Sequence, residues 1–266
     1  MRLNGRLGAA TLELIMAFVL WGIVSTAVVG TLLRTARAAR RVAVRAERRD
    51  MLRAAASLSA FELRGSAGGP ATLRVSSGGE EIEYRARRWT SVTCGWAAAS
   101  TAGLRLALRT SPNLGDRAPL PLRDSALVWI EGYPSDPADG YWGTALVTGV
   151  AAGTCPDGIP ALAIDIEPWP TTLAVAVQPG SPIVGYERAA LRVYRAADGD
   201  YWLGQATAGP AGWNVVQPVA GPLRGSSGFG LRADGKSIAV RLRSAGSDSD
   251  SIEVIVALRA DGEGTP

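Results

Sequence analysis

Residues 6–33 read RLGAATLELIMAFVLWGIVSTAVVGTLL, and this stretch decides the architecture of the chain. Its only charge after Arg6 is Glu13, and the 20 residues Leu14–Leu33 are enough to cross a bilayer as a helix about 30 Å long. A buried helix of a soluble protein rarely stays apolar on every side for this length. A secretory signal peptide would have a shorter apolar centre followed by a small-residue cleavage site. The stretch instead passes directly into an arginine-rich segment, so we expect a membrane-spanning helix that is retained.

Glu13 makes this stretch specific. An unpaired carboxylate about one turn inside an apolar span costs on the order of 2–3 kcal/mol, so it needs a positive partner. No basic side chain lies between Arg6 and Arg34. The surrounding segment, Arg6-Leu-Gly-Ala-Ala-Thr-Leu-Glu13-Leu14, resembles the processing signature of type IV prepilins and type II secretion pseudopilins.

The resemblance implies how the chain is processed and what it contacts. A prepilin peptidase would remove the leader Met1–Gly8, and Ala9 would become the N-methylated amino terminus. Glu13 would be the fifth mature residue, with the new ammonium group about 6 Å of helix rise away. This pair can close within one chain or, as the resemblance implies, between neighbouring subunits of a filament, so Glu13 would form the assembly charge pair. The implied partners are other pilin or pseudopilin subunits, the inner-membrane assembly platform and the lipid bilayer, with no direct contact to nucleic acid.

Two features depart from the common family pattern. Ala9 stands where phenylalanine is most frequent, and the leader is short, with Arg2 and Arg6 as its basic residues. A related signature in the small pseudopilins of tight-adherence systems shares Gly-Ala-Ala and the glutamate, but an aromatic residue and a shorter body usually follow. The alternative of a different class is a single-pass membrane-anchored extracytoplasmic binding protein that does not polymerise.

The charge distribution bears on topology. Residues 34–53 hold eight arginines against Glu47 and Asp50, a net +6, whereas the whole chain carries +4. Such a run is a solvated helix face or a contact with anionic lipid head groups. Positive-inside counting would place it in the cytoplasm, whereas the resemblance implies a single pass of the inner membrane with the C-terminal head in the periplasm or at the cell exterior, assembled into a filament. The cysteines and the β-rich body favour export, so we expect the second orientation.

The composition argues against most enzyme classes. The chain of 266 residues has no histidine, two cysteines and a single lysine, Lys236. Triads that need histidine are therefore absent, and two cysteines cannot hold a four-thiolate metal centre. Lys236 lies in an Asp-Gly-Lys turn without a glycine-rich phosphate loop before it. We expect no enzyme activity, no catalytic residues, no cofactor and no dedicated metal site.

Two acidic arrangements imitate functional sites. Asp165 and Glu167 lie on one strand face and could imitate the acid pair of a glycosidase, but carboxylates two residues apart on an exposed face are usually just solvated. Asp136 with Asp139, and residues 247–251, could bind calcium weakly, although neither has the ordered oxygen spacing of a dedicated loop.

The helical pattern continues beyond the membrane segment. No glycine or proline occurs from Thr31 to Arg64, and Gly65 opens a GSAGGP stretch that should end the helix. Residues 54–64 are similar to the end of the long helix in J-type minor pseudopilins and PilW-like minor pilins. The expected parts are a leader over 1–8, a transmembrane helix over 9–33, its extension over 34–64, a β-rich head over 65–260 and a disordered tail over 261–266.

The rest of the chain is typical of antiparallel β-structure. Alternating apolar and polar side chains predict strands over 82–87, 104–109, 162–167, 173–177, 237–243 and 252–258. The expected fold class is α+β, with a long N-terminal membrane-spanning helix that continues into a globular antiparallel β-sheet head, pilin-like in layout. In an exported domain Cys94 and Cys155 would most simply form a disulfide, and two unpaired buried thiols are the other possibility.

Overall fold

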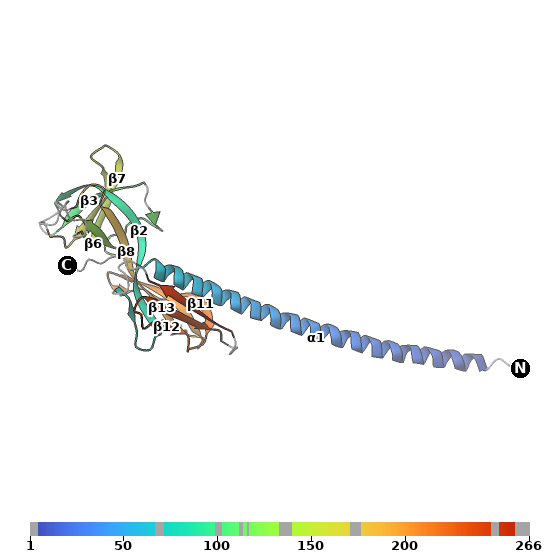
Figure 1. The fold of residues 1–266 in the computed structure, drawn as a ribbon. Helices are drawn as coiled ribbons and strands as arrows, with labels where there is room; N and C mark the ends of the chain where they lie inside the picture. The colour runs from blue at the N-terminus through green and yellow to red at the C-terminus, as the bar shows by residue number, and fades with distance from the viewer. Residues whose placement is uncertain are drawn as a thin grey trace. The chain divides into compact units, whose positions relative to one another are not determined.

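The computed structural model of the chain describes residues 5–66, 72–98, 103–111, 114–115, 117–132, 140–170, 177–245 and 250–258, with the side chains of 5–11 and 114 outside the description. One helix precedes fourteen strands in these residues (Figure 1). The elements are α1 (Gly5–Arg64), β1 (Arg74–Val75), β2 (Glu81–Ala98), β3 (Leu104–Arg109), β4 (Leu114–Gly115), β5 (Ser125–Ile130), β6 (Tyr141–Thr154), β7 (Pro160–Glu167), β8 (Pro182–Arg195), β9 (Tyr201–Gly209), β10 (Gly212–Trp213), β11 (Gln217–Leu223), β12 (Gly228–Leu231), β13 (Ser237–Arg243) and β14 (Ser251–Ala257).

The fold has the α+β layout that the sequence predicts, because one long apolar N-terminal helix precedes antiparallel strands. The chain divides into two compact units, Met1–Asp50 and Met51–Pro266, and we call the second the head. The head therefore begins earlier than the sequence-based boundary at Gly65. The reason is that the last turns of α1 belong to its core, where Leu52 and Leu63 are buried.

Six strands of the head form a closed antiparallel circuit. The C-terminal half of β2 pairs with β3, and its N-terminal half pairs with β8. The circuit is completed by the pairs β3–β7, β7–β6, β6–β5 and β5–β8. All six strands contribute buried side chains to one cluster, including Trp89, Val128 and Ile164. We call this part the barrel lobe, since a small closed sheet fills its interior with its own side chains.

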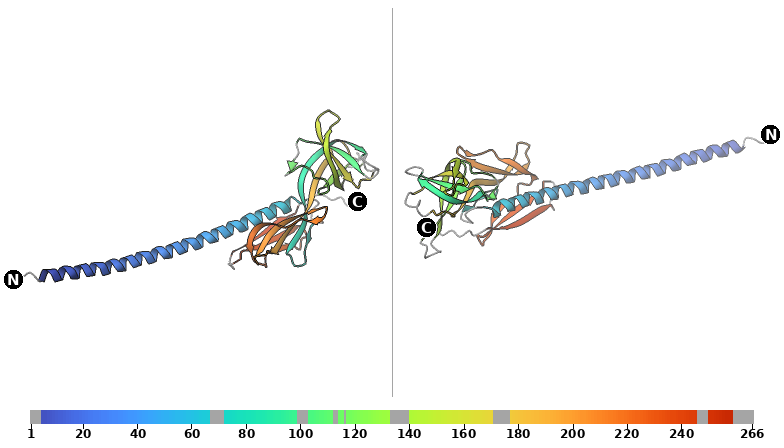
Figure 2. Two further views of the ribbon diagram at one scale, coloured as in Figure 1. Left: turned by 180° about the vertical axis from the view of Figure 1, so that it is seen from behind. Right: turned by 90° about the horizontal axis from the view of Figure 1, so that it is seen from above.

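A second cluster joins the last turns of α1 to the remaining strands. It contains apolar side chains from β2, β8, β9 and β11 and from the three-stranded sheet β12–β13–β14. Figures 1 and 2 show the C-terminal end of α1 beside β11 and β13. We call this part the helix lobe. The 18-residue β2 and the 14-residue β8 run through both lobes, so the two lobes share one continuous pair of strands.

Several predicted strands are confirmed. β13 covers Ser237–Arg243, β3 covers Leu104–Arg109, and β14 lies one residue from the expected 252–258. The single sheet that the alternation suggested is instead two sheets, because β12, β13 and β14 pair only among themselves within the described residues. Most of the predicted strand over 173–177 and the tail over 261–266 lie outside the described residues.

Cys94 and Cys155 are joined by a disulfide, as predicted. The bond links β2 to the turn that follows β6, with 5.5 Å between the Cα atoms, and both residues are buried. It spans 61 positions of sequence. Closing a loop of this length contributes on the order of 4 kcal/mol by restricting the unfolded chain.

Candidate functional site

The N-terminal part of α1 presents an apolar surface. The large hydrophobic side chains between Leu12 and Leu33 are exposed, with Phe18 at 68% and Trp21 at 74%. By length and composition the helix is able to cross a membrane. Exposed apolar area costs about 25 cal/mol per Å² in water, so this surface is stable in lipid or against other apolar helices.

The residues predicted for processing lie at the start of this helix. Gly8 and Ala9 are within the helical backbone of α1, and Glu13 follows Ala9 by four positions, or about one turn. Between Leu12 and Leu33 the carboxylate of Glu13 is the only charged side chain. Cleavage after Gly8, N-methylation of Ala9 and the pairing of Glu13 stay predictions.

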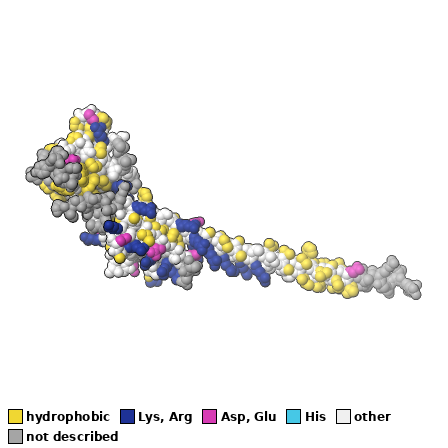
Figure 3. All heavy atoms as spheres, in the orientation of Figure 1, with side chains coloured by type: hydrophobic (Ala, Val, Ile, Leu, Met, Phe, Trp, Pro, Cys, Tyr) yellow, Lys and Arg dark blue, Asp and Glu magenta, His cyan; other side chains and the backbone are white. Residues whose placement is uncertain are grey.

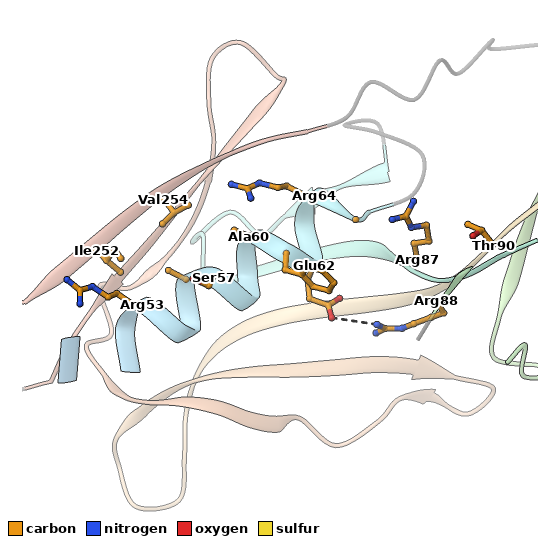
Figure 4. Close-up of a pocket in the computed structure, with 14 residues that line it drawn as sticks. Arg53, Ser57, Ala60, Glu62, Arg64, Arg87, Arg88, Thr90, Ile252 and Val254 are labelled. Carbon is orange, nitrogen blue, oxygen red and sulfur yellow. Dashed lines mark ion pairs between the residues drawn. The ribbon is translucent and has the colours of Figure 1, made fainter. Parts of the chain in front are cut away.

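The head contains an open groove of about 890 Å³ (Figure 4). Its walls come from the last turns of α1, from the middle of β2 and from β14. Ala60, Ile252 and Val254 supply apolar lining, and the exposed ring of Phe61 lies at the rim. Sequence reasoning missed this groove, because its walls come from segments almost 200 positions apart.

Basic side chains surround the groove. Arg53, Arg64 and Arg87 line it and are exposed. Glu62 is its acidic residue, and its carboxylate lies 3.6 Å from the guanidinium group of Arg88. The groove therefore combines apolar lining with a positive rim, a chemistry suited to an extended segment that carries carboxylates.

Glu62 connects the helix to β2. The hydroxyl of Tyr84 donates a hydrogen bond of 3.0 Å to Glu62, and the Gln205 side chain donates one of 3.0 Å to the Tyr84 oxygen. Burial, followed by the negative charge of Glu62, raises the pKa of Tyr84 well above its ordinary value. The phenol therefore stays protonated and holds the helix end against the sheet.

A buried charge cluster extends from this contact. Glu187 on β8 is 2% exposed and accepts hydrogen bonds from Arg88, Arg117 and Arg123. Burial alone would raise the pKa of Glu187, but hydrogen bonds and charge from Arg123, with hydrogen bonds from Arg88 and Arg117, hold it below its usual value. Because guanidinium groups occupy its oxygens, this carboxylate is structural and is not available as a general base.

Asp124 completes the cluster. It is fully buried and receives a bidentate pair from Arg117, at 2.7 and 2.6 Å, and a hydrogen bond of 3.0 Å from the Trp89 indole. The Trp89 ring lies against the backbone of Gly185, where an added Cβ would come within 1.8 Å of a ring atom. A side chain larger than hydrogen at position 185 would therefore displace the indole and with it the cluster.

The cluster was not predicted from the sequence. Its carboxylates come from α1, from the loop before β5 and from β8, and alternation patterns do not reveal such distant pairing. A signal was present at Glu187, a charged residue inside the largely apolar strand Pro182–Arg195, since a charge in a buried strand requires partners.

The acidic residues that the sequence offered as a glycosidase-like pair or as weak calcium sites form no such site among the described residues. Asp165 forms a bidentate pair with Arg105 across β3 and β7, at 2.7 and 2.8 Å. The hydrogen bond from Arg105 lowers the pKa of Asp165, so this carboxylate stays ionised. Its partner in this contact is therefore an arginine and not the second acid that a glycosidase pair requires. Asp136, Asp139 and residues 247–249 lie outside the described residues. Within the described part of the chain, no group of three or more metal-ligating side chains is found.

The comparisons with known proteins give no relative for this chain. No protein-family model, curated protein or solved structure matches it. Its function therefore has to be inferred from the residues themselves.

Proposed function

We propose that the protein is a structural subunit, a minor pilin or pseudopilin, of a type IV pilus or a type II secretion pseudopilus. In this role it is processed after Gly8 and assembled through its hydrophobic N-terminal helix. The observation that carries the proposal is the position of Glu13, the only charged side chain in an exposed apolar helix surface from Leu12 to Leu33. Removal of the leader would give this carboxylate a cationic partner, the amine of Ala9, one helical turn away.

The charge chemistry explains why processing would precede assembly. A carboxylate in hydrocarbon is costly alone and tolerable when paired. While the leader is attached, the nitrogen of Ala9 is an uncharged amide and cannot serve as the partner. After cleavage the amine can pair with Glu13 of the same chain or of a neighbour, which sets the axial register of packed helices.

The disulfide supports a head in the periplasm or at the cell exterior. Disulfides persist in oxidising compartments and are rare in the cytoplasm, and the bond between Cys94 and Cys155 lies in the head. We therefore favour an inner-membrane protein with its C-terminal part exported, against the orientation that positive-inside counting gives.

The head would supply recognition. Its groove of about 890 Å³ with a basic rim is suited to a neighbouring subunit or an exported substrate. In a filament such a head would cap, prime or decorate the polymer, while the helix anchors it.

The experiment that tests the proposal compares two glutamates of α1. In the native host we expect Glu13→Ala to leave the amount of protein in the membrane unchanged and to lower its recovery in sheared filaments at least about tenfold, because the charge pair is lost. Glu47→Ala, in the extension of the helix, is the control and should assemble normally. Normal assembly of the Glu13 variant would show that the charge pair has no such role.

The second candidate is a membrane-anchored binding protein that does not polymerise. The groove favours it as much as it favours a filament subunit. In that case the chain would be absent from sheared filaments, and both glutamate variants would keep the binding activity of the head.

A further inference from the structure

The extension of α1 beyond the apolar segment carries an ordered row of positive charge. At about 100° per residue, five of the eight arginines fall within an arc of about 80° of the helix. We call this row the arginine stripe; it consists of Arg34, Arg37, Arg41, Arg45 and Arg48. Figure 3 shows basic side chains gathered along one side of α1 next to its apolar part. Arg40 lies outside the arc although it is adjacent to Arg41 in sequence.

The stripe is not neutralised by its own helix. No stripe arginine has an acidic residue three or four positions away, which is the spacing at which helix side chains pair. The two acidic residues of this region, Glu47 and Asp50, fall on the opposite side of the helix. Arginines at these spacings repel one another, so the row disfavours an isolated helix unless an external anion neutralises it.

Lipid head groups account for only the beginning of the stripe. Arg34 follows the last residue of the apolar segment, and Arg48 lies about 21 Å further along the helix axis. The head-group layer on one side of a bilayer is about 5–8 Å thick, and salt screens exposed charges over about 8–10 Å. Arg34 and Arg37 lie within reach of head groups, whereas Arg48 lies beyond both distances.

We propose that the arginine stripe is a docking surface for a parallel helix from a different subunit, one with acidic side chains at matching spacing. This inference rests on the proposed function, in which membrane helices pack side by side. A second copy of the chain does not fit, because its own extension offers Glu47 and Asp50 against eight arginines. The protein is thereby restricted to positions beside acidic partners and does not form a polymer of itself.

The proposal also gives a reason for the unusual flank. Positive charge next to a membrane span normally holds that side in the cytoplasm. In a chain that exports this flank, the arginines do not hold the flank in the cytoplasm. Contact with an acidic helix at the same height above the membrane explains why they are present.

The test uses the protein as its own probe. The full chain is reconstituted in neutral phosphatidylcholine vesicles, and pairing is measured by energy transfer between labelled chains. The variant R37E/R41E/R45E carries an acidic row at the height of the wild-type stripe. We expect the mixed pair of wild type and variant to associate about tenfold more tightly than either chain with itself, and the difference to shrink in high salt. Equal association of all three pairs would overturn the proposal.

A matched control separates a helix face from net charge. R40E and R41E change the same charge at adjacent positions, but only Arg41 belongs to the stripe. We expect R41E to pair with the wild-type chain about fivefold more tightly than wild type pairs with itself, and R40E to stay within about twofold of wild type. Equal effects of R40E and R41E would mean that only total charge matters, and the docking surface would be rejected.

Lipid competition provides the remaining arm. If phosphatidylglycerol in the vesicles abolishes the preference for the mixed pair, head groups occupy the stripe and the proposal is wrong; if the preference persists, it is supported. These measurements use the unprocessed chain. A native chain that keeps its leader would therefore refute the filament proposal without changing the pairing measured in vesicles. Equal pairing of all chains in vesicles would refute the docking surface without bearing on the filament proposal.

Discussion

Two segments of the same helix, α1, have opposite relations to their surroundings. Between Leu52 and Leu63 one side of the helix is buried within the head, and the residues on that side are 4% exposed or less: Leu52, Ala55, Ala56, Ala60 and Leu63. Between Leu12 and Leu33 they cover all sides and are 51–74% exposed where they are large. The apolar side of the first segment is covered by other residues of the chain, whereas the apolar surface of the second needs lipid or other helices to cover it. The comparison shows that the segment 52–63 stabilises the fold of the head, whereas the segment 12–33 is available to contact lipid or other helices.

The largest expected effect separates these two segments directly. Leu63 is fully buried, so Leu63→Ala should lower the free energy of unfolding of the head by about 3–4 kcal/mol through lost burial and a cavity. Leu20→Ala, at a position 59% exposed, should change it by less than about 0.5 kcal/mol. Urea unfolding of the full chain in neutral detergent, followed by tryptophan fluorescence, measures both. Equal losses of unfolding free energy in the two variants would show that the two segments do not differ in their contribution to the stability of the head.

The buried cluster next to the helix end gives the next effect. Glu187→Gln should cost about 3 kcal/mol, because three arginines lose the carboxylate that neutralises them. Glu83→Gln, which removes the half-buried partner of the exposed Arg188, should cost less than about 1 kcal/mol. Urea unfolding at neutral pH compares the two variants.

Glu187 also predicts an acid dependence. Its pKa in the folded head is lower than its ordinary value near 4.5, so its contribution to stability is present above that value and is lost as the pH falls through the folded pKa. Unfolding free energies measured from pH 6 down to pH 3 should fall more steeply for wild type than for the glutamine variant. Parallel curves would contradict the role assigned to this carboxylate.

A smaller effect tests how tightly the helix end is packed. Ala55 is 2% exposed within the core of the helix lobe, so Ala55→Leu should cost about 1–3 kcal/mol because the added methylene groups overpack the core. Ala46→Leu, at an exposed position of the same helix, should be close to neutral. Thermal unfolding of the head distinguishes them, and an Ala55 variant as stable as wild type would mean that this face is loosely packed.

The smallest effect concerns the polar contact at the helix end. Glu62→Gln should cost about 1 kcal/mol by weakening the contacts to Arg88 and Tyr84, whereas Glu47→Gln should have no measurable effect on the head. Because the pKa of Tyr84 is raised, stability should also fall as the pH rises above about 10, and this fall should be shallower in the Glu62 variant. Alkaline titration of unfolding checks the prediction; identical slopes would contradict it.

The local features of the fold could be predicted because their signals are local. The end of α1 at Arg64 follows from the glycines after it, β13 follows from strict alternation, and the disulfide follows from two cysteines in a chain with export features. The order of strands around the barrel lobe could not be predicted in this way, because pairing partners lie far apart in sequence.

β8 shows why pattern reading failed at the centre of the head. Ala189, Ala190 and Leu191 are consecutive and fully buried, because this part of the strand is covered on both faces, so the apolar and polar alternation is lost. The charge cluster depends on β8 and on its long partner β2, and β2 also lines the groove. Glu13 could be singled out without any structure, because a carboxylate in an apolar run is conspicuous in the sequence itself.

The most direct measurement is the intact mass and amino-terminal sequence of the mature protein purified from native membranes. The account predicts a chain that begins at an N-methylated Ala9, with Met1–Gly8 removed. A mature chain that retains Met1, or that begins at any other residue, would contradict it and leave a membrane-tethered head that does not polymerise.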